Sequence, residues 1–486
     1  MMHTNFDVLL AELRKGERNI RVDSRLVCPG DVFVALPGST QDGSAYIPQA
    51  ISRGAAFVVC ERHGALDCDC RDAGLVLCPQ ARSALWKLAQ ARYGTARLPF
   101  PLIGVTGTNG KTSIVFMLEH IFNSCGKNSG ILGTVSYRWP GFSRQASLTT
   151  PACLELHESL GAMREAGVEV AAMEVSSHAL DQQRVGGLDF SAAIFSNLTQ
   201  DHLDYHQNME AYYAAKARLF LELPKDDKLC VINCDNQAGR RLLASCRQGL
   251  GFGLDENTVQ VSGSRYLAGR ILASNREGLH LKMRFETSEW ELRSPLVGAY
   301  NASNLLAAQA LCLGFGLSVS ELRCLEKFTG VPGRLERIEN RQGLHVFVDY
   351  AHTPDALVHV LQSLRGAGFA RLITLFGCGG DRDRSKRPLM GEAVARYSDV
   401  AVLSSDNPRS EDPLAIMADV LPGLAGAKQL VQEADRRTAT RLALDMLGPE
   451  DALLVAGKGH EDYQIIGTTR YPYSDQQVLR ELLKCV

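Results

Sequence analysis

The chain has 486 residues, of which 45% are hydrophobic and 22% charged, and its formal net charge at pH 7 is −2. This length predicts about three domains, and the composition is typical of a globular protein with sizeable cores. A charge so close to zero gives no electrostatic basis for nucleic acid or an anionic membrane as the main partner. The first residues do not read as a signal peptide, and no apolar run approaches the ~20 residues that span a bilayer. We therefore expect a cytoplasmic protein, and we predict in addition that it is a monomer.

The cysteines point to free thiols. There are 14 of them without a secretory signal, which indicates a reducing compartment. Four of them cluster, at Cys60, Cys68, Cys70 and Cys78, but their spacing matches no zinc pattern well.

Short apolar runs that end in Gly, Ser, Asp or Asn alternate with helical patterns along most of the chain, which favours parallel α/β architecture. A Pro-rich seam at 98–101 and a Gly/Pro-rich stretch at 329–333 separate three blocks. We predict an α/β fold of three domains. A small α/β domain spans 1–97, a central P-loop ATPase domain with a mostly parallel sheet spans 98–330, and a Rossmann-like, doubly wound domain spans 331–486.

A phosphate-binding loop is predicted directly after the apolar run 102–106. Backbone amides of such a glycine-rich loop, at a helix N-terminus, bind phosphate oxygens. Lys111 would reach the β- and γ-phosphates, and the Thr112 hydroxyl would ligate Mg²⁺. The usual spacing puts a further glycine where Val105 stands, but a nucleotide site is still favoured over a purely structural turn. The predicted ATP-binding residues are Gly107, Thr108, Asn109, Gly110, Lys111, Thr112 and Ser113.

Two further apolar runs lead into polar residues. The run 168–174 reads as a buried strand ending in the carboxylate of Glu174, and the run 190–196 leads into a polar stretch that contains His202 and His206. A carboxylate at a strand end near a phosphate loop suits a hard cation such as Mg²⁺. The two histidines are four residues apart and raise a zinc alternative, but the glutamate of a metalloprotease helix is absent between them. A purely structural role for these polar residues also stays open.

Four motifs follow one another in a fixed order: 107–112, Glu174-Val175-Ser176-Ser177-His178, 197–204 and Tyr213-Ala214-Ala215-Lys216. Together with Asn301–Asn304, Gly333-Arg334 and Asp349–Pro354, they resemble the Mur ligase family, which builds the peptide of the bacterial cell wall. The resemblance covers essentially the whole chain. It implies an ATP-dependent ligase that forms an amide bond, with Lys111, Glu174, His202 and Lys216 as catalytic residues.

The resemblance also implies a modified lysine. In this family the lysine that corresponds to Lys216 is carbamylated by CO₂, which turns a cation into a carboxylate able to hold Mg²⁺. The pKa of a free lysine is near 10.4, so the site must favour the neutral amine. Spacing alone favours an ordinary surface lysine on a helix. By similarity, one or two Mg²⁺ ions are held by Thr112, Glu174, His202 and the modified Lys216.

The remaining ATP contacts implied by the family are Asn301, Arg334 and Asp349. Because Arg334 and Asp349 belong to the third block, the ATP site would be completed by closure of that block about the seam at 330–333.

Substrate residues are likewise implied by the resemblance. The first block is similar to a uridine-nucleotide domain, with UDP contacts from Ser24, Ser39, Thr40 and Gln41. The muramoyl-peptide part would be held by Thr149, Thr150, Ser176, Gln182 and Arg184. The planar fork of Arg184 suits a carboxylate or phosphate.

The amino acid to be added is indicated by Asp406-Asn407-Pro408-Arg409. Family members with arginine in this motif use meso-diaminopimelate, whereas lysine-adding members carry another residue. By similarity, the pocket comprises Arg382, Asp406, Asn407, Pro408, Arg409, Gly457 and Glu461. Lysine in this pocket would leave an arginine desolvated without a partner, at a cost on the order of 3 kcal/mol.

Three alternatives to a diaminopimelate-adding ligase stay open. A lysine-adding Mur ligase would share the whole architecture. A folylpolyglutamate synthase shares the ATP core but should lack the uridine-binding block, against which Asp23-Ser24-Arg25 argues. A non-catalytic, nucleotide-responsive binding module is disfavoured because the lysines, glutamate and histidine of the predicted site are all present.

Overall fold

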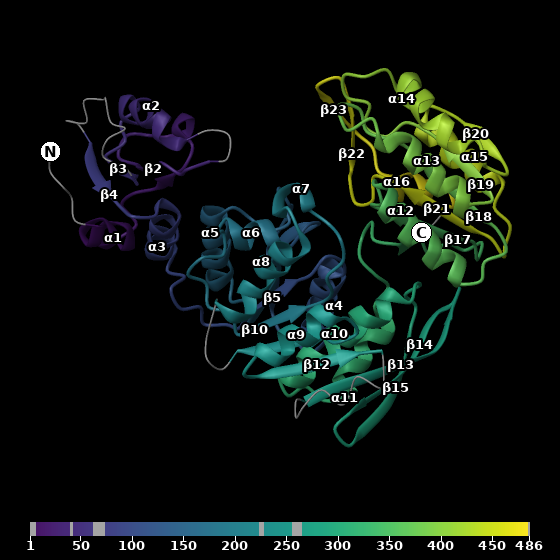
Figure 1. Cartoon of the computed structure of the whole chain (residues 1–486), viewed down its shortest axis with the longest axis horizontal. Helices are drawn as coiled ribbons and strands as arrows, with labels where there is room; N and C mark the ends of the chain where they lie inside the picture. The colour runs from purple at the N-terminus through teal and green to yellow at the C-terminus, as the bar shows by residue number, and fades with distance from the viewer. Residues whose placement is uncertain (1–5, 39–41, 62–72, 223–227, 255–264, 485–486) are drawn as a thin grey trace. The chain divides into compact units, whose positions relative to one another are not determined.

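The computed structural model describes residues 6–38, 42–61, 73–222, 228–254 and 265–484. The chain divides into two compact units (Figure 1). The first holds the described residues up to 251 together with 310–315, and the second holds 252–254, 265–309 and 316–484. No helix within the described ranges has the length and apolar character needed to cross a membrane. The α/β class predicted from the sequence is confirmed, while the predicted boundaries at 97 and 330 stay predictions.

The first part of the chain forms a small parallel sheet with the strand order β1-β2-β3-β4. Its elements are α1 (Phe6–Arg14), β1 (Ile20–Arg21), η1 (Ser24–Leu26), β2 (Val32–Val34), η2 (Gly43–Tyr46), α2 (Ile47–Ser52), β3 (Phe57–Cys60), β4 (Gly74–Leu77) and α3 (Ala81–Tyr93). Val32 and Val34 pack in one core cluster with α1 and α3, whereas Phe33 packs in another with α2. This alternation is what a strand buried on both faces requires.

A second sheet follows, in which β11, β10, β5, β9 and β6 are parallel neighbours and β7 and β8 continue it antiparallel. The elements here are β5 (Leu102–Thr106), α4 (Lys111–Ser124), β6 (Ser129–Leu132), β7 (Ser136–Trp139), β8 (Phe142–Gln145), α5 (Cys153–Glu165), β9 (Val170–Glu174), α6 (Ser177–Asp181), β10 (Ala192–Phe195), α7 (Leu203–His206), α8 (Met209–Leu221), β11 (Leu229–Asn233), α9 (Gln237–Ser245) and β12 (Gly249–Gly253). Every residue of β5, β9 and β10 is buried, as expected for central parallel strands.

The second unit begins with three antiparallel strands, β13 to β15, which the sequence analysis did not anticipate. Its elements are β13 (Arg265–Asn275), β14 (Gly278–Phe285), β15 (Ser288–Ser294), α10 (Tyr300–Gly314), α11 (Val319–Leu322), η4 (Arg323–Lys327), β16 (Glu336–Arg337), β17 (His345–Asp349), α12 (Pro354–Gly366), β18 (Leu372–Phe376), α13 (Lys386–Tyr397), β19 (Val400–Leu403), α14 (Pro413–Val420), η5 (Leu421–Leu424), β20 (Leu430–Gln432), α15 (Arg436–Asp445), β21 (Ala452–Ala456), β22 (Tyr463–Ile466), β23 (Thr469–Pro472) and α16 (Asp475–Leu482).

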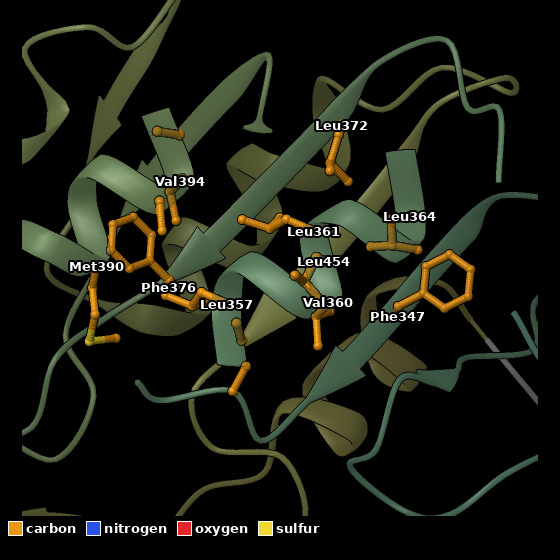
Figure 2. Packing of buried hydrophobic residues seen from close by; sticks show 14 of the residues in the cluster. Phe347, Leu357, Val360, Leu361, Leu364, Leu372, Phe376, Met390, Val394 and Leu454 are labelled. Atoms are coloured by element: carbon orange, nitrogen blue, oxygen red, sulfur yellow. The ribbon is translucent and has the colours of Figure 1, made fainter. Parts of the chain in front are cut away.

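The sheet of the second unit has the order β16-β17-β21-β18-β19-β20 and is parallel except for β16. One face packs against α12, α13 and α14, and Phe347 and Phe376 lie in that core (Figure 2). Val346 and Val348 alternate with Phe347 along β17 and face the opposite core, which α15 and α16 cover. Helices on both faces of a parallel sheet make this the predicted doubly wound domain.

Candidate active site

The loop between β5 and α4 takes the shape expected for phosphate binding. Gly107 and Gly110 have φ angles of +144° and +87°, which favour glycine. A Cβ atom on Gly107 would lie 2.0 Å from Ser196 Oγ, so no side chain fits there. Val105 is fully buried inside β5. The usual motif has its first glycine at the position of Val105, which here is still part of β5. The first glycine with a positive φ is Gly107, two residues later, so no glycine is needed at position 105.

A second loop, which follows β10, holds the phosphate loop in place. Ser196 Oγ donates to the carbonyl of Asn109 at 2.5 Å, and the carbonyl of Asn197 accepts from Thr108 N at 3.0 Å. The side chain of Asn197 also accepts from Asn109 N at 2.9 Å. No role was predicted for Ser196 or Asn197, although Asn197 opens one of the motifs that carried the resemblance.

Two lysines meet at the phosphate loop. Lys111 Nζ donates to the carbonyls of Gly107 and Thr108 at 3.0 and 2.9 Å, and Lys216 Nζ donates to the same Gly107 carbonyl at 2.8 Å. The Lys216 ammonium also lies 4.4 Å from the ring centre of Tyr212. Only 1% of Lys216 is exposed, so the surface-lysine alternative is wrong. Burial first, and then the charge of Lys111, lower the pKa of Lys216 well below its usual range, which favours the neutral amine.

Glu174 ends β9 directly beside Val105 of β5, two residues before the phosphate loop. Its carboxylate is buried and accepts from Thr134 N at 2.7 Å and from Thr134 Oγ1 at 3.1 Å. A Cβ on Gly133 would lie 2.4 Å from Glu174 Oε1. The turn 133–134 thus fixes the direction of this carboxylate, and no local pattern in the sequence marks this role.

The histidines do not form the alternative zinc pair. His206 is buried and its Nε2 lies 2.9 Å from Ser177 Oγ, whereas His202 is half-exposed and lies 3.5 Å from Asp201. The ring of His202 instead lies 4.9 Å from that of His178 and 6.1 Å from that of Tyr212. The ring of Tyr212 therefore lies beside both the ring of His202 and the side-chain nitrogen of Lys216. Within the described ranges, no group of three or more His, Cys, Asp or Glu side chains is arranged to hold a metal ion.

Four of the residues predicted to hold the muramoyl peptide form one hydrogen-bonded cluster. Thr150 Oγ1 donates to the Glu174 carbonyl at 2.9 Å and lies 3.3 Å from Ser176 Oγ. Arg184 donates to the Thr150 carbonyl at 3.2 Å and to Gln182 Oε1 at 2.8 Å. Thr149 reaches this cluster through Thr134 Oγ1, at 3.2 Å.

Of the predicted UDP contacts, Ser24 begins η1, between β1 and β2. Ser24 is buried and donates to Gln49 Oε1 at 2.6 Å. Ser39, Thr40 and Gln41 lie outside the described residues.

Asn301, Arg334 and Asp349 all belong to the second unit. Asp349 ends β17, and its carboxylate accepts from the backbone N–H groups of Leu335 and Ala351, each at 2.7 Å. Burial raises the pKa of Asp349. Arg334, next to Leu335, lies with its guanidinium 5.2 Å from the ring centre of Tyr350, and its Nε is buried without a partner among the described residues. Asn301 is buried and donates to the Val297 carbonyl at 2.9 Å.

The predicted amino-acid pocket gathers at the carboxyl edge of the second unit's sheet, where ligands of doubly wound folds bind. Asp406, Asn407 and Pro408 are buried in the loop after β19. Arg382 and Arg409 flank Gly379, since a Cβ on that glycine would lie 3.7 Å from Arg382 Cγ and 2.9 Å from a terminal nitrogen of Arg409. The side chains of two arginines therefore border one small residue.

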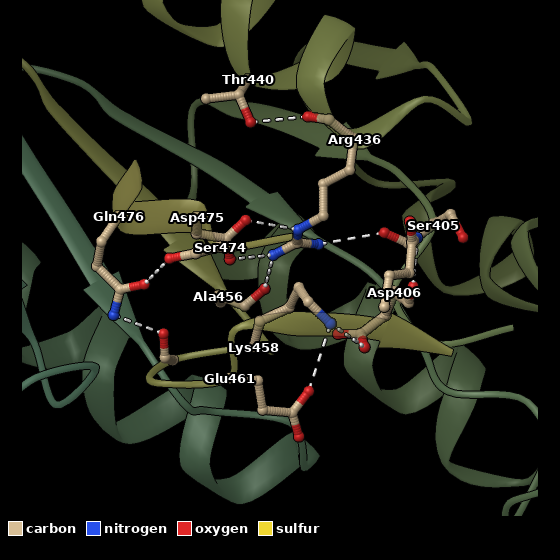
Figure 3. Close-up of polar contacts among 12 residues, drawn as sticks. Ser405, Asp406, Arg436, Thr440, Ala456, Lys458, Glu461, Ser474, Asp475 and Gln476 are labelled. Atoms are coloured by element: carbon tan, nitrogen blue, oxygen red, sulfur yellow. Dashed lines mark hydrogen bonds and ion pairs between the residues drawn. The ribbon is translucent and has the colours of Figure 1, made fainter. Parts of the chain in front are cut away.

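Gly457 and Glu461 come from the loop after β21. A Cβ on Gly457, whose φ is +114°, would lie 2.5 Å from Asp406 Oδ2, so glycine lets the two loops approach. Asn407 Nδ2 donates to Glu461 Oε2 at 3.0 Å. The side chain of Lys458 lies between Asn407 and Glu461, and Figure 3 shows it pointing at Asp406 and Glu461.

A buried ion pair contacts the backbone that leads into both pocket loops, the one after β19 and the one after β21. Arg436 is 1% exposed and binds Asp475, which is fully buried, at 2.8 Å. The same guanidinium donates to the carbonyls of Ser405 and Ala456 at 3.3 and 2.9 Å, as Figure 3 shows. It thus ties the backbone ahead of Asp406 to the backbone ahead of Gly457. No local pattern marks Arg436, because its partners lie 20 to 39 residues away.

Known proteins can now be set beside this geometry. The Mur ligase middle domain matches residues 105–312, the Mur ligase glutamate ligase domain matches 333–459, and the Mur ligase family catalytic domain matches 18–93. A protein of Lawsonia intracellularis named UDP-N-acetylmuramoyl-L-alanyl-D-glutamate–2,6-diaminopimelate ligase is 56% identical over 477 residues, or 98% of each chain. The chain belongs to the Mur ligase family.

Solved structures agree with this assignment. A structure titled as a ligase of the same name aligns with this Mur ligase at a TM-score of 0.69 and 32% identity, covering 96% of this chain and 94% of that one. A Mycobacterium tuberculosis folylpolyglutamate synthase complexed with ADP aligns at a TM-score of 0.59 and 20% identity, covering 77% and 91%. At that identity it shows a shared fold only.

Proposed function

We propose that this Mur ligase joins meso-2,6-diaminopimelate to UDP-N-acetylmuramoyl-L-alanyl-D-glutamate in an ATP-dependent reaction that forms an amide bond. The observation that carries the proposal is the convergence of Lys111 and Lys216 on the Gly107 carbonyl. Two basic side chains at one backbone oxygen of a phosphate loop suit a site that handles a triphosphate. The Lawsonia relative, similar over nearly its full length, supports the choice of substrates.

ATP would lie on the loop Gly107–Ser113, with its phosphates at the N-terminus of α4. Lys111 would exchange its two backbone contacts for the β- and γ-phosphate oxygens. We propose that Asn301, Arg334 and Asp349 also contact ATP. The buried, unpartnered Nε of Arg334 supports this for that residue, because a buried donor without a partner is costly unless a ligand supplies one.

The residues present fit a carbamylated lysine and Mg²⁺. CO₂ adds only to a neutral amine, and the lowered pKa of Lys216 favours that form. Thr112, Glu174, His202 and the carbamate on Lys216 would hold one or two Mg²⁺ ions, which when bound neutralise charge on the transferring phosphoryl group. Thr134 holds the Glu174 carboxylate in a fixed direction before any ion binds.

The chemistry follows from the poor reactivity of a free carboxylate. An oxygen of the D-glutamate γ-carboxylate attacks the γ-phosphorus of ATP, the bond to the ADP oxygen breaks, and an acyl phosphate forms. Lys111 stabilises the charge on the transferring group. The amine of diaminopimelate then attacks the acyl carbon, phosphate leaves, and the nitrogen gives up one proton. No side-chain nucleophile is needed, so the protein acts mainly by positioning its reactants.

The acceptor and the amino acid have separate proposed sites. The cluster of Thr149, Thr150, Ser176, Gln182 and Arg184 would hold the muramoyl peptide, and Ser24 with residues 39–41 would hold UDP. For the amino acid, Arg382 and Arg409 would bind the distal carboxylate, and Glu461 would bind an ammonium. The buried segment 406–408 and Gly457 would shape this pocket. We also expect a cytoplasmic monomer without nucleic-acid or membrane partners.

The test is a ligation assay with purified protein, UDP-muramoyl-dipeptide, ATP, Mg²⁺ and bicarbonate. We expect ADP and the muramoyl-tripeptide to appear with diaminopimelate and to fall at least about 100-fold with lysine, because lysine leaves an arginine unpaired. Equal rates with both amino acids would contradict the proposed pocket. ATP turnover with a folate acceptor instead would contradict the proposed function altogether.

A further inference from the structure

Lys458 has no assigned role, yet it lies at the centre of the proposed amino-acid pocket. Its side chain is 0% exposed. The ammonium lies 3.1 Å from Asn407 Oδ1. It also lies 3.3 Å from Glu461 Oε2 and 3.8 Å from Asp406 Oδ1 (Figure 3). A buried lysine needs such partners, so its contacts account for its own burial. They also constrain the two neighbours that face the amino acid.

The first constraint concerns the amide of Asn407. A lysine ammonium can only donate hydrogen bonds, so the atom of Asn407 that faces it must be the oxygen. The backbone N–H of Ile465 donates to the same oxygen at 2.9 Å. The amide nitrogen of Asn407 is then directed at Glu461 Oε2, at 3.0 Å. Lys458 and the N–H of Ile465 together determine which end of this amide each neighbour meets.

The second constraint concerns the Glu461 carboxylate. Lys458 and Asn407 both bind its Oε2 atom, which leaves Oε1 for a ligand. In this cluster the cations Arg436 and Lys458 face three carboxylates, on Asp406, Glu461 and Asp475, so one negative charge is in excess. The side chain of Glu461 is 14% exposed, against 9% for Asp406 and 0% for Asp475. The excess charge is therefore most accessible at Glu461.

We propose that Lys458 is a positioning residue of the amino-acid pocket. It binds one oxygen of Glu461 and shares the Asn407 oxygen with the N–H of Ile465, so that the other oxygen of Glu461 and a single negative charge are offered to the ammonium of the incoming amino acid. This inference rests on the proposed function, because that function supplies an amino acid with a cationic group. It adds that the affinity for this group depends on a buried side chain that never touches it.

The experiment measures KM for diaminopimelate and for ATP in Lys458→Met and Lys458→Gln. Methionine fills a similar volume without charge, and glutamine keeps a donor while it loses the charge. We expect KM for diaminopimelate to rise at least about tenfold in both variants, because the cation that holds one oxygen of Glu461 is lost, while KM for ATP changes less than about twofold. A loss of packing alone would not separate the two constants in this way.

A double-mutant cycle with Glu461→Gln tests whether Lys458 acts through Glu461. We expect Lys458→Met to add little, less than about twofold in KM for diaminopimelate, once Glu461 is already glutamine. The matched control is Arg371→Met. Arg371 pairs with Asp451 at 2.6 Å ahead of β18 and β21, and so at the edge of the same sheet opposite to the pocket. We expect it to leave both Michaelis constants unchanged.

The possible outcomes distinguish failure of the proposed function from failure of the positioning role of Lys458. Wild-type protein that releases no ADP with diaminopimelate refutes the proposed function and this inference with it. Active wild-type protein together with an unchanged KM in both Lys458 variants refutes the inference alone. It is also overturned if the effects of Lys458→Met and Glu461→Gln multiply independently, or if both Lys458 variants lose the cooperative melting transition of the wild type.

Discussion

Replacing Lys216 with methionine should make the protein more stable and inactive. The side chain is 1% exposed, and its amine donates one hydrogen bond, to the Gly107 carbonyl. Holding a lysine neutral at pH 7 costs up to about 5 kcal/mol, since each pKa unit below 10.4 is worth about 1.4 kcal/mol. The lost hydrogen bond offsets about 1 kcal/mol of this. In CO₂-free buffer, Lys216→Met should therefore raise the free energy of unfolding of its unit by up to about 4 kcal/mol.

The pH dependence of that gain has a definite sign. The folded-state pKa of Lys216 is lowered, so the unfolded wild type binds more protons and wild-type stability rises with pH. The advantage of methionine should narrow as the pH approaches the ordinary lysine pKa. Activity should fall at least about 10³-fold at all pH values, because the carbamate cannot form.

A second buried lysine provides the control. Lys228 is 4% exposed, donates to the Leu219 carbonyl and also has a pKa lowered mainly by burial. Lys228→Met should share the gain in stability and keep its activity. Urea unfolding and ADP release measure the two quantities. Turnover at the wild-type rate in Lys216→Met would refute this account. Provided that Lys228→Met keeps its activity as expected, the account is also refuted if added short-chain carboxylic acids restore no activity to Lys216→Ala.

Three further predictions concern other parts of the site. Arg409→Ala should raise KM for diaminopimelate at least about tenfold and leave KM for ATP unchanged, because the proposed partner of the distal carboxylate is lost together with its bond to the Gly380 carbonyl. Equal effects on both constants would contradict the pocket. The control is Arg384→Ala, whose partner Asp419 lies in α14. In limiting bicarbonate, activity should fall as the pH is lowered, since protonation of Lys216 competes with CO₂ for the amine. ¹³C NMR with labelled bicarbonate should show a carbamate signal in the wild type that is absent from Lys216→Met. A carbamate signal that remains in Lys216→Met would mean that another amine is modified. Gly107→Ala should abolish ATP binding, because its Cβ would meet Ser196 Oγ. The control is Gly126→Ala, also at positive φ but with no atom within 4 Å of the added Cβ, which should lower the free energy of unfolding by only about 1 kcal/mol and retain ATP binding. Calorimetric titration with ATP distinguishes the two variants.

The parts of the fold that were predicted correctly have local signals. The run 102–106 is β5 with all five residues buried, and the loop that follows takes positive φ angles at its two glycines. Parallel strands covered on both faces read as continuous apolar runs, so their position can be seen without knowing their neighbours. The same holds for β17, β18, β19 and β21 of the second unit. The fold class predicted from such patterns is confirmed, and so is the family that the order of the motifs indicated.

The parts that were not predicted depend on contacts between distant residues. Lys216 bonds to a carbonyl 109 residues earlier, and spacing along α8 gives no sign that this face is buried. Thr134 orients a carboxylate 40 residues later, and Arg436 ties loops that follow two different strands. Such residues are polar, buried and without a periodic pattern. Only the folded chain shows that they contact residues of the proposed sites or the backbone beside those residues.

The central claim is that ATP activates a carboxylate of the muramoyl-dipeptide as an acyl phosphate. The most direct measurement uses substrate with both oxygens of the D-glutamate γ-carboxylate labelled with ¹⁸O. Attack of one labelled oxygen on the γ-phosphorus, followed by attack of the amine on carbon, should leave one ¹⁸O in the released phosphate and one in the tripeptide. Phosphate free of label, formed together with tripeptide at the same rate, would contradict the account.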